Sequence, residues 1–243
     1  MSVLIGSARS SYGNTAPGDQ NGGREVSTEK WYLHSKGWVV IRAKDPEARE
    51  RIATAMERAC ANNDIGYDQS TRNTLYNDVK PYGFDPARTT KKVNTDCSAL
   101  VRVCVHYAGI EVDDFITSNE VSKLMATGDF EKFTDDAHCK SSDRLLRGDL
   151  LVTRTKGHTV AVLSDGAKAA EERPSASVEP AQSGDLTVAA GTWNLRLVPG
   201  TQYSVVKTVH GGDRLVSVDP DGWLPVLIDG EVRWISPKAI ATP

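Results

Sequence analysis

One stretch of the sequence, residues 167–184, separates two parts of the chain that follow different patterns. It is rich in Ala, Glu, Pro and Ser, a composition typical of a linker or of a frayed last strand. Before it, segments with helical periodicity alternate with β-like segments, whereas after it only short β-like runs occur. The sequence therefore predicts an α+β domain over residues 1–172, a linker over 173–183 and a small all-β domain, a partly open barrel, over 184–243.

The composition excludes several classes of protein. Of the 243 residues, 39% are hydrophobic, enough for ordinary cores, and the formal net charge is −3 with no run of Lys or Arg. Because nucleic-acid binding needs a concentrated basic face, we expect no nucleic-acid partner. No segment approaches the length of a membrane span, so we expect no membrane insertion.

The sequence also lacks the signals of export and of metal binding. Met1 to Ser10 contain one apolar run of three residues with no basic residue before it, too short for a signal peptide, so we expect synthesis in a cytoplasm. The four cysteines are widely spaced without a C-x-x-C pair, which predicts neither disulfides nor a metal site, and no cofactor is expected. These cysteines are Cys60, Cys97, Cys104 and Cys139.

Periodicity and capping residues predict the elements of the first domain. Four helices are expected, from Asp45 to Asn62, from Ser70 to Pro81, from Asp96 to Gly109 and from Ser118 to Gly128. Strands are expected at 38–42 and in a hairpin formed by 148–154 and 158–163. The remaining segments are expected to lack regular structure: a loop-forming arm at 8–29, a turn at 65–69 and polar chain at 129–142.

A cysteine stands where a polar loop gives way to the third of these helices. Thr95 or Asp96 can cap the helix, which places Cys97 in its first turn. The positive end of a helix favours thiolate over thiol, so we expect the pKa of Cys97 to be lowered and the thiol to be a nucleophile. The alternative is a small buried core residue.

A nucleophilic thiol needs a base, and histidine is the usual one because it accepts and returns a proton near neutral pH. Five histidines are available, and His158 is the one that opens a strand beside a glycine. A strand histidine by itself is more often structural than catalytic. The hypothesis therefore depends on the combination of His158 with the cysteine.

Three motifs occur in a characteristic order: Asp96-Cys97-Ser98 on a helix, Gly148-Asp149-Leu150 on a strand, and Gly157-His158 on the next strand. Over about residues 45–166 this order resembles the NlpC-type cell-wall cysteine peptidases, which have a papain-like fold. It also resembles peptidase domains of bacteriophages of Gram-positive hosts, in which an arm like residues 18–22 and a turn like residues 65–69 recur. The resemblance implies that Cys97 is the nucleophile and His158 the base, and that Asp96 and Ser98 help to hold the stem peptide.

Two further roles of the family are less well matched. A polar residue that orients the histidine usually follows it by about twelve positions, where this chain has Ala170. The third catalytic member is therefore open between Glu171, Asp165, Asp19 and a backbone carbonyl. A tyrosine whose hydroxyl lines the oxyanion site usually precedes the cysteine. Tyr67 is the candidate, Tyr82 is nearer in sequence, and a packing role is the alternative for Tyr67.

The last sixty residues resemble a bacterial SH3-type cell-wall-binding domain. Three stretches carry this resemblance: 193–200, with Asn194-Leu195-Arg196 and a Pro-Gly turn, 221–224 and 233–236, which bear tryptophans. Such domains contact peptidoglycan through aromatic side chains. Trp193, Tyr203 and Trp223 are candidates for this contact, although a core role is the alternative for at least two of them.

Together these features predict a two-domain peptidoglycan hydrolase of the phage or prophage endolysin type. It would cleave an amide in the stem peptide or cross-bridge of a bacterial cell wall, that of a Gram-positive host, after release at lysis. One alternative is an N-acetylmuramoyl-L-alanine amidase of the same fold. The alternative from another class is a catalytically inactive wall-binding or virion structural protein.

Overall fold

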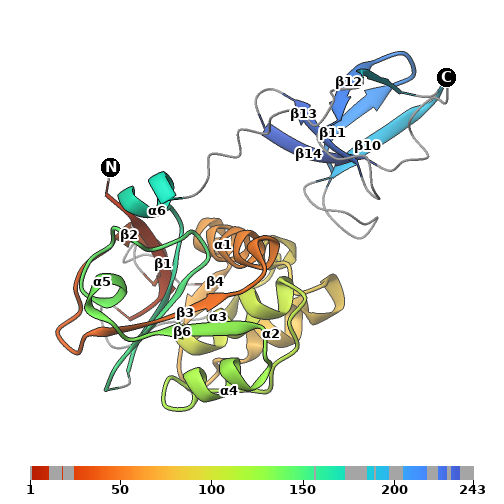
Figure 1. Cartoon of the computed structure of the whole chain (residues 1–243). Helices are drawn as coiled ribbons and strands as arrows, with labels where there is room; N and C mark the ends of the chain where they lie inside the picture. The colour runs from red at the N-terminus through yellow and green to blue at the C-terminus, as the bar shows by residue number, and fades with distance from the viewer. Residues whose placement is uncertain are drawn as a thin grey trace. The chain divides into compact units, whose positions relative to one another are not determined.

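The computed structural model describes residues 2–10, 18, 25–155, 157–172, 185–188, 190–196, 205–217, 224–228 and 231–235. The chain forms two compact units, Met1–Glu172 and Arg173–Pro243, each with its own sheet (Figure 1). Within these described ranges, no helix is long and apolar enough to cross a membrane.

A six-stranded antiparallel sheet is the centre of the first unit. Its strand order is β2-β1-β8-β7-β3-β6, so the N-terminal strand β1 lies between β2 and β8. A separate pair of short parallel strands, β4 and β5, precedes α3. The bounds are β1 Leu4–Ala8, β2 Val26–Lys30, β3 Trp38–Ala43, β4 Ile65–Tyr67, β5 Val93–Thr95, β6 Phe130–Phe133, β7 Leu150–Thr153 and β8 Thr159–Val162.

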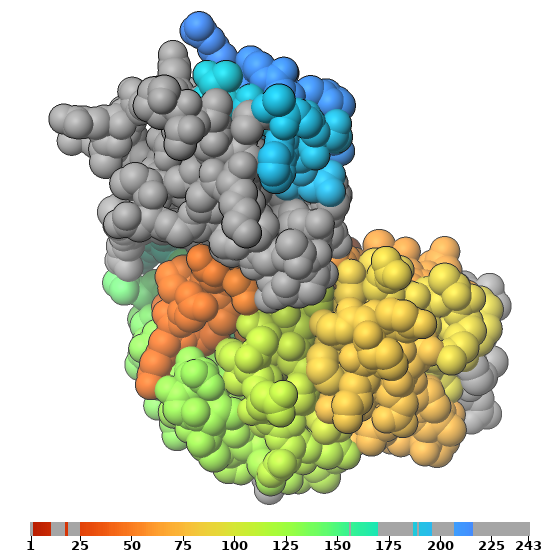
Figure 2. Space-filling model, turned by 90° about the vertical axis from the view of Figure 1, so that its right-hand side faces the viewer, coloured from red at the N-terminus to blue at the C-terminus, as the bar shows by residue number. Residues whose placement is uncertain are grey.

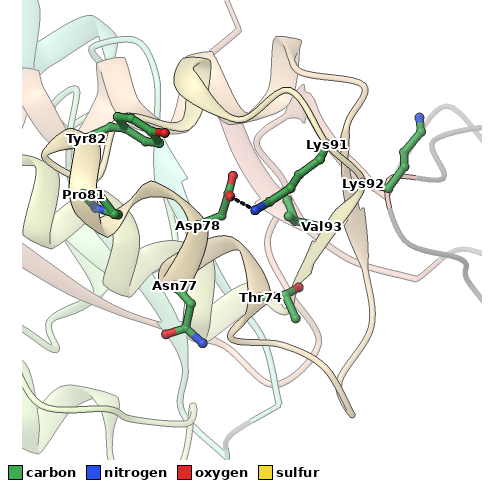
Figure 3. A pocket seen from close by; sticks show the side chains of 8 residues that line it. All are labelled: Thr74, Asn77, Asp78, Pro81, Tyr82, Lys91, Lys92 and Val93. Atoms are coloured by element: carbon green, nitrogen blue, oxygen red, sulfur yellow. Dashed lines mark ion pairs between the residues drawn. The ribbon is translucent and has the colours of Figure 1, made fainter.

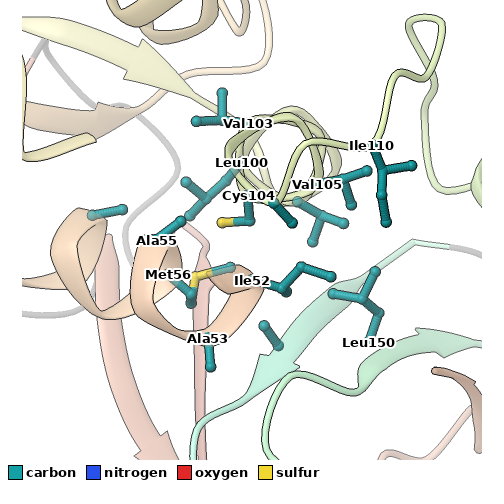
Figure 4. Close-up of a cluster of buried hydrophobic side chains, with 14 of the residues drawn as sticks. Ile52, Ala53, Ala55, Met56, Leu100, Val103, Cys104, Val105, Ile110 and Leu150 are labelled. Carbon is teal, nitrogen blue, oxygen red and sulfur yellow. The ribbon is translucent and has the colours of Figure 1, made fainter. Parts of the chain in front are cut away.

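The large sheet is buried on both faces, because its side chains alternate between two apolar clusters. One face packs under the helices α1 (Pro46–Ala61) and α3 (Cys97–Tyr107). Figure 4 shows Ile52 and Met56 of α1 facing Leu100 and Cys104 of α3, with Leu150 contributed by the sheet. The opposite face carries a smaller cluster around the buried Trp38, which includes Val160 and Val162 of β8.

The predicted helices of this unit are confirmed. The Asp45 side chain accepts the backbone N–H groups of Glu47 and Ala48, and proline occupies the first turn of α1, where a missing N–H is harmless. The helices α2 (Thr74–Val79) and α4 (Glu120–Ala126) lie within the segments expected for them. The segment that carries α2 and the 3-10 helices η1 (Lys80–Tyr82) and η2 (Pro86–Arg88) forms one lobe at the surface of this unit, yellow in Figure 2.

Several segments differ from expectation. Strands were not expected at Leu4–Ala8 and Val93–Thr95, which form β1 and β5. The arm at 8–29 ends in the strand β2, the turn at 65–69 contains β4, and the polar chain at 129–142 contains β6 and the short helix α5 (Asp136–Cys139). These strands are short, and they are fixed by pairing with distant segments, which local patterns do not reveal. Residues expected to begin a linker or a frayed strand instead form α6 (Ala167–Glu172), consistent with the high helix propensity of Ala, Lys and Glu.

The second unit contains only strands within the described residues, as predicted. They form an antiparallel sheet in the order β11-β10-β14-β13-β12-β9. The bounds are β9 Asp185–Thr187, β10 Thr192–Arg196, β11 Val205–His210, β12 Arg214–Ser217, β13 Leu224–Ile228 and β14 Glu231–Ile235.

Candidate active site

Cys97 is the first residue of α3, as the sequence predicted. Asp96 caps this helix, because its Oδ1 accepts the backbone N–H of Ala99 at 2.7 Å and the hydroxyl of Ser98 at 2.9 Å. The strand β5 leads directly into the cap, so the parallel pair β4–β5 fixes the approach to the cysteine. Only 7% of Cys97 is exposed.

The electrostatic environment of Cys97 opposes ionisation. Burial, the largest effect, and the negative charges of Asp96 and Glu120 raise the pKa of Cys97, the backbone of Thr159 and Ser98 lowers it, and the net pKa is about 12. The expected lowering by the helix N-terminus is therefore wrong, because desolvation of the thiolate is the larger effect. The resting sulfur is a neutral thiol.

The strand β8, which begins directly after His158, packs against α3, the helix that begins at Cys97. The imidazole packs 6.4 Å from the ring of Trp38 and 6.5 Å from the ring of His34, between ring centroids. Among the described residues, no hydrogen bond joins this imidazole to the thiol. Burial, the largest effect, and the positive charges of Arg9 and His34 together lower the pKa of His158 to about 4.

Asp96 and Ser98 are held by an arginine that the sequence analysis did not single out. Arg72 places its Nε 2.6 Å from Asp96 Oδ2 and its Nη2 3.1 Å from Ser98 Oγ, and it donates to the carbonyl of Phe115. Both side chains are therefore engaged with the helix cap and Arg72. No sequence pattern marks Arg72, because it follows a loop and precedes a short helix.

Tyr67 ends the strand β4, beside the residues that lead to the cysteine. Burial raises the pKa of this half-buried tyrosine, and the charges of Cys97 and Asp96 raise it further, which places its hydroxyl within their electrostatic reach. Tyr82 instead is half-exposed and lines a surface pocket. Of the two tyrosines considered, Tyr67 is the one whose backbone pairs with Thr95, two residues before Cys97.

Of the side chains considered for the third catalytic member, the structure describes only that of Asp165, which lies away from His158. Asp165 accepts the backbone N–H of Arg147 at 2.7 Å, at the opposite end of β8 from His158. Asp19 and the side chain of Glu171 lie outside the described part of the chain. Two polar groups near the imidazole are His34 and Arg9, of which Arg9 falls in the arm expected at 8–29.

Sequence patterns also did not reveal a buried carboxyl group that contacts β8. Glu120, the first residue of α4, is fully buried, and its Oε1 accepts the hydroxyl of Thr159 at 2.7 Å. Burial raises the pKa of Glu120 to about 8. A glutamate in the first turn of a predicted helix normally lies at the surface near the positive helix end, so the sequence carries no signal for this burial.

The comparison with known families concerns the unit that contains this site. The sequence model of the endolysin-like domain family matches residues 7–169, which run from β1 into α6. The chain belongs to the endolysin-like domain family. This confirms the resemblance to endolysin-type domains and indicates a lytic function directed at the bacterial cell wall, with peptidoglycan as substrate. No curated protein sequence matches the chain significantly.

Two buried groups of the endolysin-like domain predict opposite dependences of its stability on pH. The folded pKa of His158, about 4, is below the unfolded value of 6.5, so stability rises with pH between 4 and 6.5 because the unfolded chain binds the extra proton. The folded pKa of Glu120, about 8, is above the unfolded value of 4.5, so stability falls with pH between 4.5 and 8.

We expect these two effects to oppose each other between pH 4.5 and 6.5. Each corresponds at most to one proton, or about 1.4 kcal/mol per pH unit. Urea denaturation should show that Glu120→Gln makes stability rise more steeply with pH in this window, whereas His158→Gln makes it fall more steeply. Parallel pH curves for the two variants would contradict both assignments.

A surface pocket of about 510 Å³ lies on the endolysin-like domain beside α2 and the start of β5 (Figure 3). Its carboxylate, Asp78, is paired with Lys91 at 2.6 Å and accepts the hydroxyl of Thr89. The hydroxyl of Thr74 is likewise engaged with the backbone of Asn94. The polar groups of this pocket are thus largely satisfied by one another.

The remaining site predictions concern metals and the second unit. Among the described residues, no group of three or more His, Cys, Asp or Glu side chains has the geometry of a metal site. Trp193 lies on β10 and is partly exposed. Tyr203 and Trp223 lie outside the described residues.

Proposed function

We propose that the chain is an endolysin that cleaves an amide bond in the peptidoglycan stem peptide or cross-bridge with Cys97 as nucleophile. The observation that carries this proposal is that α3, which begins at Cys97, packs against β8, the strand that begins directly after His158. The helix packed on an antiparallel sheet is consistent with a papain-like, NlpC-type domain over residues 1–172.

The chemistry starts from two neutral groups. His158 is a neutral imidazole at pH 7, so it can take the thiol proton as the sulfur attacks the carbonyl carbon. The Cys97 backbone N–H and the Tyr67 hydroxyl are the donors for the oxyanion. The carbon–nitrogen bond then breaks, His158 returns the proton to the leaving amine, and water hydrolyses the thioester.

The structure supports one alternative to an active enzyme. The imidazole packs against Trp38 and His34, and the pKa of Cys97 is raised to about 12, which are features of a resting or inactive site. A catalytically inactive wall-binding or virion protein would keep this arrangement permanently. Digestion of purified Gram-positive walls, followed by mass spectrometry of the released ends, separates the possibilities. New amino ends at D-Glu or a cross-bridge identify an endopeptidase, ends at lactyl groups identify the amidase, and no new ends would contradict hydrolysis.

The second unit is proposed to attach the enzyme to the wall. In this proposal residues 173–183 are a linker, residues 184–243 are an SH3-like wall-binding domain, and Trp193, Tyr203 and Trp223 are its contact residues. The partly exposed Trp193 on an all-β unit supports this role. The host is proposed to be Gram-positive, and the enzyme to reach its wall after release at lysis.

Deleting residues 184–243 is expected to weaken sedimentation with cell walls while leaving cleavage of soluble peptidoglycan fragments within about twofold of the full chain. The reason is that the catalytic candidates all lie in the first unit, whereas tethering raises the local concentration of enzyme at the wall. Circular dichroism should first show that the shortened chain is folded. Unchanged sedimentation would remove the anchoring role.

A further inference from the structure

Arg72 joins the cap of α3 to the segment that follows this helix. Its Nε lies 2.6 Å from Asp96 Oδ2 and its Nη2 lies 3.1 Å from Ser98 Oγ, so it contacts both chain neighbours of Cys97. The same Nη2 donates to the carbonyl oxygen of Phe115 at 2.5 Å. Only 14% of the Arg72 side chain is exposed. One guanidinium therefore binds the chain on both sides of the nucleophile candidate and a residue beyond α3.

The segment of residues 115–120, here called the bridging segment, also binds the chain on both sides of His158. The two hydrogen bonds run from the Gly157 N–H to Thr117 Oγ1 at 3.2 Å and from the Thr159 hydroxyl to Glu120 Oε1 at 2.7 Å. Arg72 binds the bridging segment at its first residue. The flanks of the cysteine and of the histidine are thus connected through Arg72 and this segment.

The bridging segment is a closed turn. The Ile116 N–H donates to Asn119 Oδ1 at 2.9 Å, and the Ile116 carbonyl accepts the N–H groups of Asn119 and Glu120 at 3.0 and 2.9 Å. Phe115, at its start, is buried. Because these bonds close the turn on itself, a displacement of Phe115 also displaces the residues that bind beside the histidine.

The connection through Arg72 differs in kind from the packing of α3 on β8. That packing belongs to the apolar core, and apolar contacts have no preferred direction. Hydrogen bonds from a guanidinium are directional, because its N–H groups lie in one plane at fixed angles. We therefore expect packing to bring the two elements together and Arg72 to set their register.

We propose that Arg72 is a positioning residue that fixes Cys97 relative to His158, because it binds the cap of α3 and the bridging segment at once. This inference rests on the proposed roles of Cys97 as nucleophile and His158 as base. A misplacement of about 1 Å between reacting groups can cost about 100-fold in rate. Loss of Arg72 should therefore lower kcat more than it changes substrate binding.

The test is a double-mutant cycle on the alkylation of Cys97 by iodoacetamide at neutral pH, followed by peptide mass spectrometry. A histidine that takes the thiol proton accelerates this reaction, so His158→Gln should lower its rate at least about tenfold in the otherwise wild-type protein. In the Arg72→Ala background His158→Gln should change the rate by less than about twofold, because the two groups are no longer aligned. On soluble peptidoglycan fragments, Arg72→Ala should lower kcat by about 10- to 100-fold with KM within about twofold.

Arg58 supplies the matched control, because it too is a partly buried arginine paired with a capping aspartate. Its Nη1 lies 2.8 Å from Oδ2 of Asp85, whose Oδ1 caps η2. It also donates to the hydroxyl of Tyr107, at the opposite end of α3 from Cys97. Arg58→Ala should lower the stability measured in urea, yet keep kcat within about twofold and retain the full effect of His158→Gln on alkylation.

The outcomes separate this inference from the proposed function. An equally large effect of His158→Gln in the Arg72→Ala background, or an unchanged kcat of folded Arg72→Ala, would overturn the positioning role and leave the proposed function standing. No effect of His158→Gln on alkylation in either background would remove the histidine as base and overturn both proposals.

A second variant covers the case in which Arg72→Ala does not fold. Arg72→Lys keeps a positive charge beside Asp96, but an ammonium cannot donate to Asp96, Ser98 and the Phe115 carbonyl in the same fixed directions. The effect of His158→Gln on alkylation should again be smaller in this background than in the wild type. An undiminished effect there also overturns the inference.

Discussion

Replacing Cys97 with alanine is expected to lower the rate of cell-wall degradation by at least about a thousandfold, because no other group can form the covalent intermediate. The fold should be retained, since the change removes a single sulfur from a site at the edge of the core. Turbidity clearing of purified Gram-positive walls, with mass spectrometry of the released ends, measures the effect.

Cys104→Ala is the matched control for this experiment. Cys104 lies on the same helix two turns further on, fully buried between α1 and α3, and takes no part in the proposed chemistry. Its replacement should reduce stability through the small cavity that it leaves, and clearing by folded protein should stay within about twofold. Equal clearing by Cys97→Ala and the wild type would contradict the nucleophile assignment.

Replacing Gly148 with alanine is expected to unfold the first unit, or to destabilise it by several kcal/mol. Gly148 has φ +88°, which disfavours any residue with a Cβ, and a Cβ there would lie 2.1 Å from the carbonyl oxygen of Arg49. The obstacle is backbone, so no rotation of a side chain relieves it. Thermal and urea denaturation of the purified variant, or its failure to accumulate as soluble protein, measures the effect.

Gly128 supplies the control for this second experiment, because it has a similar φ of +83° but no atom within 4 Å of the position of a Cβ. Gly128→Ala should cost only about 1 kcal/mol, the strain of the left-handed backbone alone. Similar losses of stability from Gly148→Ala and Gly128→Ala would show that the close contact with the Arg49 carbonyl oxygen is not what requires glycine at position 148.

The contacts of Gly148 and Asp149 give a structural reason for the Gly148-Asp149-Leu150 motif. Gly148 allows the chain to pass close to Arg49, and the buried Asp149 accepts the Nε and Nη2 groups of Arg42 at 2.7 Å each. Leu150 then enters the core between α1 and α3. The motif therefore fixes the start of β7, the strand that pairs with the histidine-bearing β8.

Local sequence patterns predicted the elements whose determinants are local. Asp45 and Asp96 cap their helices as expected, and the hairpin of β7 and β8 follows from its alternating residues. The patterns did not predict β1, β2, β4, β5 or β6, because these short strands depend on partners far away in the sequence. The burial of Glu120 has the same origin, since it depends on Thr159 across the fold.

The identity of the third catalytic member stays open, and the topology limits where it can lie. Residues 167–172, which include Ala170, form the helix α6, and the neighbours of β8 are β7 and the N-terminal strand β1. Side chains near His158 are therefore contributed by the beginning of the chain, as Arg9 is.

The pairing of β1 with β8 also sets the order in which this protein can be completed during translation. Ile5 pairs with Val162, so β1 leaves the ribosome long before the strand that covers one of its edges. Contacts of such large sequence separation form slowly, since the intervening chain must be closed into a loop. A nascent chain interrupted before β8 lacks both Thr159 and His158, so no such partly synthesised chain holds an assembled site.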